Sequence, residues 1–164
     1  APMQEVAKLF IGIFVTMMPV LAMLKAGEAG AFAPVARAVT GDAGQPLPWA
    51  YFWLAGGLSS FLDNAPTYLT FAATASGLVG ISLEGRYLAE YLGKGREAAE
   101  ILAAISAGAV LMGANTYIGN GPNFMVKSIA HDAGVHCPTF FGYIFKYSLP
   151  ILLPILVAVG LVFL

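Results

Sequence analysis

The sequence predicts an all-α integral membrane protein, and three observations lead to this prediction. Of the 164 residues, 59% are hydrophobic and only 10% are charged, whereas soluble domains have roughly 25% charged residues. So few charges cannot cover a water-facing surface. The apolar residues come in runs of a length typical of membrane helices, and two of these runs are interrupted by polar residues. This composition excludes a coiled coil, a disordered tail and a disulfide-rich module.

The first apolar run predicts a transmembrane helix over residues 6–25. Sixteen uncharged residues separate Lys8 from Lys25, and at about 1.5 Å per residue they span roughly 24 Å. Both lysines can extend their ammonium groups to the membrane surface. Pro19 predicts a kink in this helix. No signal-peptide cleavage pattern follows the run, so we expect the helix to be retained.

The second apolar region predicts a re-entrant hairpin over residues 49–78. It opens with an aromatic group, WAYFW, of the kind found at the level of lipid headgroups. Asp63 is the only charged residue between positions 43 and 83, and it lies in SSFLDNAPTYLTF. Asp-Asn-Ala-Pro interrupts the helical pattern there, and Pro66 leaves the carbonyl of Leu62 without its usual helical donor.

The third apolar region predicts a broken transmembrane helix over residues 97–131. Residues 101–126 are twenty-six uncharged positions that contain GANTYIGNGPNF. The glycines and the proline of this segment favour non-helical backbone, so we expect half-helices over 97–112 and 122–131. A last transmembrane helix is expected over 139–164, with Lys146 as its one charged residue.

The two interruptions predict a transport site. Backbone groups that leave helical geometry inside a bilayer cost several kcal/mol each unless protein or a watery cavity satisfies them. Transporters use such breaks, because unwound carbonyl groups coordinate cations and the N-termini of half-helices favour anions. Carboxylate, amide and hydroxyl oxygens suit Na⁺. The candidate ligands from the residues alone are Asp63, Asn64, Thr67, Asn115, Thr116, Asn120 and Asn123, of which Asp63, Asn64, Asn115 and Asn120 are the expected Na⁺ ligands.

Simpler explanations exist for the same residues. Asp63 is also suited to be the N-cap of the half-helix that follows it. Residues 115–123 are also compatible with a polar turn, and Ser60 suits helix packing as well as ligation. Neither interruption holds the His, Cys and carboxylate cluster of a transition-metal site. We expect no resident cofactor, with Na⁺ as a transported or coupling ion.

Several function classes are excluded. The net charge of −1 leaves no basic stripe, which excludes nucleic acid as a partner. Cys137 is the only cysteine, so it forms no internal disulfide, and His131 and His136 do not complete a metal site with it. Asp63 has no second intramembrane carboxylate and no serine has a recognisable His partner, so we expect that the protein is not an enzyme.

The motifs SSFLDNAPTYLTF and, about fifty residues later, GANTYIGNGPNFMVKSIA resemble the C-terminal half of the ion transporter superfamily. The nearest resemblance is to bacterial citrate-transporter-like membrane proteins, many of which are described as Na⁺/H⁺ antiporters. It covers nearly the whole chain. It implies one half of an inverted-repeat, elevator-type transporter, with substrate and Na⁺ between the hairpin and the broken helix. It further implies a homodimer and a multi-pass location in the inner membrane of a bacterium.

The resemblance also carries residues over by position. Ser60–Thr67 fall where dicarboxylate members have a Ser-Asn-Thr motif, and Gly113–Asn123 fall where they have a Pro-Asn motif, which adds Ser60 and Gly119 to the site. Two departures matter. Asp63 replaces a neutral position, which would repel a di- or tricarboxylate and suits a cation or a proton. Only one inverted repeat is present, so we expect a fragment or a subunit that needs the N-terminal half of the same transporter.

We therefore expect a secondary active ion transporter in the lipid bilayer, with Na⁺/H⁺ antiport as the leading hypothesis. The alternative is Na⁺-coupled symport of citrate or another organic anion. A third hypothesis is a membrane subunit that does not transport and whose polar interruptions only pack against a partner. Orientation stays open, because the positive-inside rule and the resemblance place the hairpin on opposite sides.

Overall fold

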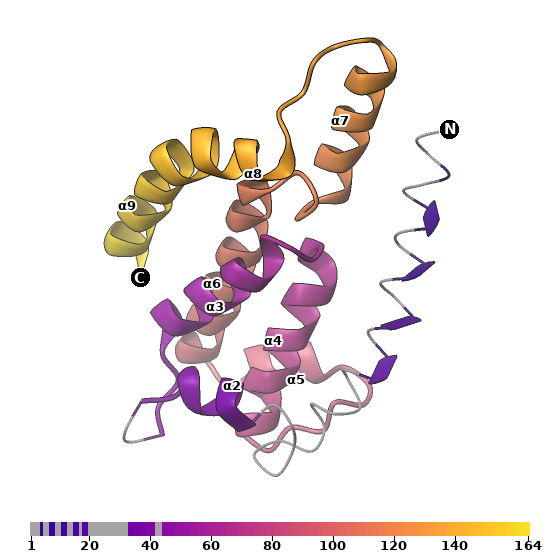
Figure 1. The fold of residues 1–164 in the computed structure, drawn as a ribbon. Helices are drawn as coiled ribbons and strands as arrows, with labels where there is room; N and C mark the ends of the chain where they lie inside the picture. Colours follow the sequence, from indigo (N-terminus) through magenta and orange to yellow (C-terminus); the bar gives the residue numbers. More distant parts are fainter. Residues whose placement is uncertain are drawn as a thin grey trace.

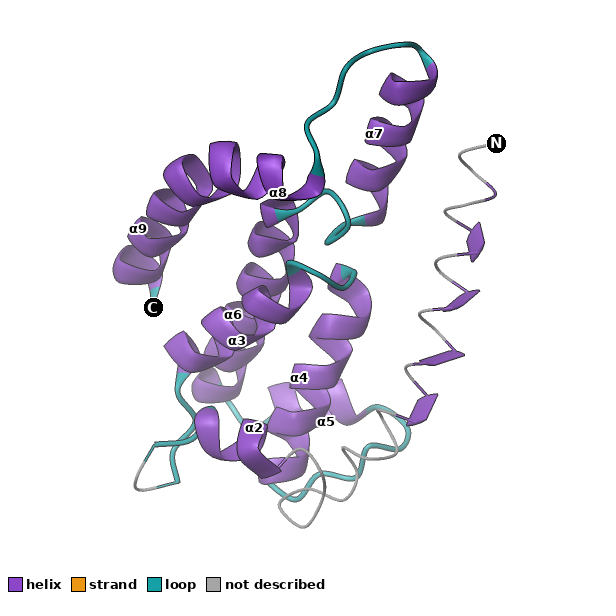
Figure 2. Ribbon diagram, viewed as in Figure 1, coloured by secondary structure: helices purple, strands orange, loops and turns teal. Residues whose placement is uncertain are grey.

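The computed structural model describes residues 33–41 and 44–164, together with residues 4, 7–8, 11–12, 15–16 and 18–19. Over these residues the protein is helical and has no β-strand, as Figure 2 shows. The only extended pairing among them is an isolated bridge between Thr40 and Pro46. The expected helix over 6–25 falls largely outside the described residues. The all-α class is confirmed for the part of the chain that the structure describes.

Figure 1 shows the helices along the chain. The α-helices are α2 (Ala33–Ala38), α3 (Pro48–Ser59), α4 (Asn64–Leu78), α5 (Tyr87–Leu92), α6 (Arg96–Met112), α7 (Gly121–Asp132), α8 (Phe140–Tyr143) and α9 (Leu153–Phe163). Two segments have other hydrogen-bond patterns: the 3₁₀-helix η2 (Gly113–Asn115) and the π-helix η3 (Ile144–Leu152).

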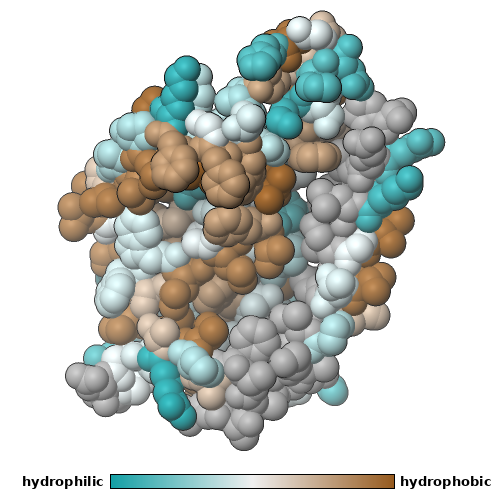
Figure 3. Space-filling model, viewed as in Figure 1, coloured by the Kyte–Doolittle hydropathy of each residue, from teal (hydrophilic) through white to brown (hydrophobic). Residues whose placement is uncertain are grey.

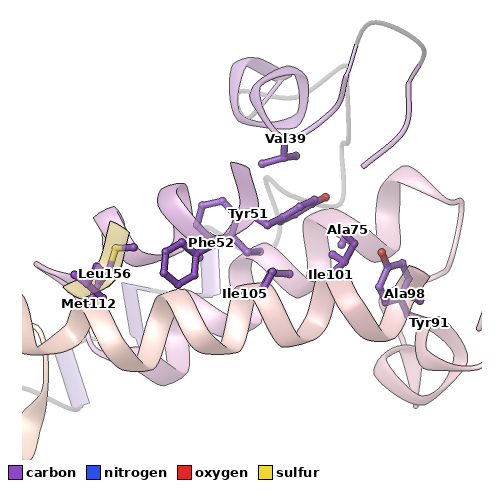
Figure 4. Close-up of a cluster of buried hydrophobic side chains, with 13 residues drawn as sticks. Val39, Tyr51, Phe52, Ala75, Tyr91, Ala98, Ile101, Ile105, Met112 and Leu156 are labelled. Atoms are coloured by element: carbon purple, nitrogen blue, oxygen red, sulfur yellow. The ribbon is translucent and has the colours of Figure 1, made fainter. Parts of the chain in front are cut away.

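The core lies between α3, α4 and α6. Tyr51 and Phe52 of α3 and Ile101 and Ile105 of α6 are fully buried, and Figure 4 shows these side chains in a row along α6. Gly108 lets the two helices approach closely, because a Cβ atom there would collide with the carbonyl oxygen of Phe52. Small residues at helix contacts are typical of membrane helices, which have no hydrophobic effect to drive them together.

Among the described residues, two helical segments are long and apolar enough to cross a membrane: Arg96–Asn115 and Phe140–Phe163. The second segment exposes its apolar side chains, with Phe145 68% and Leu161 83% exposed. Figure 3 shows these side chains gathered over α8 to α9. A core helix of a soluble protein would bury such residues, whereas a lipid-facing helix exposes them. The segment therefore fits a membrane protein.

The last apolar span is helical from α8 to α9, but its backbone hydrogen-bond pattern changes along its length. We expected one helix over 139–164, and the structure has α8, η3 and α9 in succession. Pro150 lies inside η3 and Pro154 lies in the first turn of α9. A proline has no N–H for the carbonyl four residues earlier, so the backbone is forced away from regular α-helical bonding.

Candidate functional site

The two polar interruptions lie against each other. The first is residues 60–63 between α3 and α4, and the second is residues 113–120 between α6 and α7. Ser60 Oγ donates to the carbonyl oxygen of Met112 at 3.1 Å and accepts from Asn115 Nδ2 at 3.1 Å. Thr116 Oγ1 donates to the carbonyl oxygen of Ser60. Segments more than fifty residues apart in the sequence are thus joined at one serine.

Ser59 and Asn64, which flank the first interruption, make a second connection, to α6 and to the second interruption. Ser59 Oγ donates to the carbonyl oxygen of Ala109 at 2.6 Å. One side of the Asn64 amide faces only acceptors, which assigns its nitrogen to that side. In this orientation Nδ2 donates to the carbonyl oxygens of Ala109 at 3.1 Å and Gly119 at 3.2 Å. The amide nitrogen of Asn64 therefore holds the two interruptions together.

Gly119 marks the place where carbonyl groups from both interruptions converge. A Cβ atom on Gly119 would lie 2.5 Å from the carbonyl oxygen of Ser59 and 2.8 Å from those of Ser60 and Gly113. Only glycine fits so close to three backbone oxygens. Among the residues described, no backbone N–H outside the helices donates to the carbonyl of Ser59 or Ser60. Such a group of carbonyl oxygens favours a cation.

Asp63 caps a different helix from the one expected. It occupies the N-cap position of α4, but its side chain makes no capping hydrogen bond there. Its Oδ1 instead accepts from the backbone N–H of Gly121, the first residue of α7, at 3.3 Å. The N-termini of α4 and α7 thus meet at one half-buried carboxylate, and both helix ends favour negative charge. No Lys or Arg in the described part of the chain forms an ion pair with Asp63.

The remaining predicted residues have other surroundings. Thr67 is fully buried, and its Oγ1 donates to the carbonyl oxygen of Asp63 at 3.0 Å. Asn120 is the N-cap residue of α7, where its carbonyl accepts from Phe124 N at 3.2 Å. Asn123 lines a pocket on another side of α7. Over the described residues, the side chains of Asn120 and Asn123 make no hydrogen bond to the first interruption.

Of the nine predicted residues, the structure joins six through hydrogen bonds or close approach between the two interruptions. These six are Ser60, Asp63, Asn64, Asn115, Thr116 and Gly119.

Like Ser59, two residues of the last span hold the site and were not predicted from the sequence. Ser148 Oγ of η3 donates to the carbonyl oxygen of Asn115 at 2.5 Å, and Ser148 is buried. Tyr143 OH of α8 donates to the carbonyl oxygen of Ala114 at 3.2 Å. The sequence feature that could have indicated Ser148 as a site residue is its hydroxyl group inside an otherwise apolar run. Its partner lies 33 residues earlier in the chain, so the sequence did not indicate it.

Comparison with protein families matches all of residues 1–164 to a family described as "Putative citrate transport". The chain belongs to this family. The resemblance to citrate-transporter-like membrane proteins is thereby confirmed, and the family supports a transporter. No curated protein and no solved structure matches the chain.

The groups gathered at the two interruptions determine what this member of the citrate transport family could bind. It presents one carboxylate, several neutral oxygens and a set of backbone carbonyl groups at the junction of four helix ends. Within the described residues, no group of His, Cys, Asp and Glu side chains could hold a transition metal. The oxygen set suits a proton or an alkali cation.

Proposed function

We propose that the chain is one half of a Na⁺/H⁺ antiporter in which Asp63 alternately binds a proton and Na⁺. The observation that carries this proposal is the position of Asp63, which belongs to the first interruption, accepts a hydrogen bond from the start of α7, and has no cationic partner among the described residues. An ionisable residue at membrane depth is expensive unless it has a function. Competition between two ions for one carboxylate is sufficient to couple their movements.

The oxygens around Asp63 would complete the Na⁺ site. Asn115 donates its amide nitrogen to Ser60 Oγ, which leaves Oδ1 of the same amide as an acceptor. The carbonyl groups of Ser59 and Ser60 converge with that of Gly113 beside Gly119. We propose that Asp63 and Asn115 bind Na⁺ together with Asn64, Asn120 and one or more of these carbonyl oxygens.

The proposal includes the rest of the transporter. A second, inverted repeat would cover the exposed face of the interruptions, and the two repeats would move as an elevator against a homodimeric scaffold in a bacterial inner membrane. This part rests on the resemblance of the two motifs and on the match to the family.

Ion flux in liposomes tests the proposal. The full-length transporter is reconstituted with a pH-sensitive dye inside, and Na⁺ is added outside. We expect Na⁺ to drive proton efflux without citrate, and we expect Asp63→Asn to abolish that efflux because the amide cannot exchange a proton. Thr70→Val, which changes a buried hydroxyl in α4 away from the interruptions, is the control and should retain the flux. Na⁺-driven efflux that persists in Asp63→Asn would refute the mechanism.

Symport of citrate with Na⁺ is the second candidate, and two observations favour it. The family description names citrate, and the N-termini of α4 and α7 meet at one point, where an anion is favoured. In this case Asp63 would belong to the Na⁺ site, and citrate carboxylates would lie at the helix N-termini. Uptake of labelled citrate that depends on a Na⁺ gradient, with no Na⁺-driven proton efflux in the absence of citrate, would favour symport.

A further inference from the structure

A pocket of about 500 Å³ lies outside the hydrogen-bonded junction of the two interruptions. Its walls come from Tyr117 of the second interruption, from α7, from residues 137–138 of the following loop, and from the α8–η3 segment. Figure 1 shows α7 standing apart from the group formed by α3, α4 and α6. Among the described residues, none of α3, α4 or α6 lines the pocket.

One positive charge lines this pocket. Lys127 Nζ lies 4.2 Å from the centre of the Tyr117 ring, and both residues are part of the lining. No carboxylate of the described residues forms an ion pair with Lys127. A cation–π contact stabilises an ammonium group only partly and leaves its charge available to an anion.

The rest of the lining is mostly apolar. Val126 and Ala130 of α7 face the pocket from one side, and Ile151 and Leu152 of η3 face it from the other. A ligand that matches these walls has a hydrocarbon body and a single negative charge. A tricarboxylate such as citrate matches poorly, because Lys127 is the one cation of the lining and cannot balance three carboxylates; Asn123 and the tyrosines add only neutral polar groups.

We propose that this pocket binds an anionic phospholipid of the surrounding membrane. Lys127 Nζ would hold the phosphate, as basic pockets between membrane helices do with acidic headgroups. The acyl chain would lie along Val126, Ala130, Ile151 and Leu152. The lipid would join α7 to the last span and so steady Gly121, whose N–H holds Asp63. The proposal requires a membrane location but does not depend on which ion or substrate is transported.

Cys137 provides a built-in reporter for occupancy. It is the only cysteine of the sequence, it is half-buried, and it lines the pocket. The purified protein is placed in nanodiscs of phosphatidylglycerol or of phosphatidylcholine with the same acyl chains. Alkylation of Cys137 by uncharged N-ethylmaleimide is then followed by mass spectrometry of its peptide. We expect alkylation to be about tenfold slower in phosphatidylglycerol, because a bound lipid covers the thiol in proportion to its occupancy.

Three variants make the outcome specific to Lys127. Lys127→Gln should lose the slowing, and Lys127→Arg should retain it because the charge remains. Lys146→Gln is the matched control, since Lys146 also lies near a tyrosine ring, 5.7 Å from the centre of Tyr147, but does not line the pocket. It should behave like the unchanged protein. The lipid charge is the same for all variants. A general effect of the anionic surface on the thiol would therefore slow alkylation equally in all of them, whereas binding at Lys127 would not.

Several results would overturn the proposal. Equal alkylation in the two lipids would exclude a site selective for anionic headgroups. Slowing that survives in Lys127→Gln would exclude Lys127 as the ligand. Slowing by free oleate in phosphatidylcholine nanodiscs, without slowing by phosphatidylglycerol, would point to a fatty acid instead of a membrane phospholipid. Should Lys127→Gln unfold, Lys127→Met removes the same charge and takes its place in the comparison.

Discussion

At Gly119 a Cβ atom would lie within 2.8 Å of three backbone oxygens, so a substitution there tests how closely the two interruptions must approach each other. We predict that Gly119→Ala destabilises the protein by about 1–3 kcal/mol, the usual cost of forcing an added methyl group into a packed site. Gly57→Ala is the control, because a Cβ atom at Gly57 meets nothing within 4 Å. In the interior of α3 it should be neutral or stabilising. Equal unfolding free energies for the two variants would contradict the geometry.

Ser148 is the residue that connects the last span to the site. Its hydroxyl donates to the carbonyl oxygen of Asn115 in a buried setting, so we predict that Ser148→Ala costs about 1–3 kcal/mol by leaving that carbonyl without its partner. Because Asn115 is a proposed ligand, the apparent affinity for Na⁺ should also weaken. Both quantities are measured in detergent, by denaturant unfolding and by Na⁺ titration.

Ser128→Ala of α7 is the matched control for Ser148→Ala. Ser128 makes no hydrogen bond through its side chain within the described residues, so this variant should change neither quantity. A Ser148→Ala protein that matches it in both measurements would show that the last span does not support the site.

At the scale of elements, the short helix α5 docks on α6 outside the proposed membrane-spanning segments through Tyr91, which is 3% exposed. Burial raises the pKa of the Tyr91 phenol above its ordinary value, and the charge of Glu97 raises it further. The folded state therefore favours the neutral phenol, and this preference contributes stability that is complete below pH 10, the ordinary pKa.

We predict that the unfolding temperature falls as the pH rises above about 10. In this range Tyr91 ionises in the unfolded chain, whereas in the folded protein it stays neutral to a higher pH. Tyr91→Phe should show a smaller fall, because a phenylalanine has no proton to lose. Differential scanning calorimetry between pH 8 and 11 measures both. A fall of the same size in Tyr91→Phe would assign the effect to other tyrosines.

Much of the helical framework could be predicted from residue type. Glycine and proline mark the ends of α6 and α7, so the expected half-helices over 97–112 and 122–131 lie within one residue of the observed Arg96–Met112 and Gly121–Asp132. The π-helical stretch was not predicted, because the sequence pattern of an apolar span does not distinguish hydrogen-bond registers. Whether residues 49–78 re-enter the membrane stays a prediction.

The sequence predicted which residues bring polar groups to the candidate site, but not which groups contact one another. Polar residues in apolar surroundings indicated both interruptions, and six of the predicted residues join them. The partner of Asp63 is the backbone N–H of Gly121, and a backbone group has no signature in the sequence. Asn123 belongs to the same polar segment, yet it lines the pocket between α7 and the last span instead of the junction of the two interruptions.

At the scale of the whole molecule, a polar centre lies between apolar helices. The ends of α3 and α6 and the beginnings of α4 and α7 meet there, while α8 to α9 expose apolar side chains on the outside (Figure 3). Such a distribution suits a bilayer, and the only carboxylate of the interruptions, that of Asp63, is half-buried at this polar centre. A cation or a proton would offset the cost of that charge, which is why the two should compete.

The measurement that tests this competition most directly is Na⁺ binding to the purified full-length transporter as a function of pH. We predict that Na⁺ binding releases one proton per Asp63 wherever that carboxyl is protonated, and that in this range the apparent affinity weakens about tenfold for each unit by which the pH is lowered. Asp63→Asn should remove both effects. Na⁺ binding with the same affinity at every pH, and without proton release, would contradict the account.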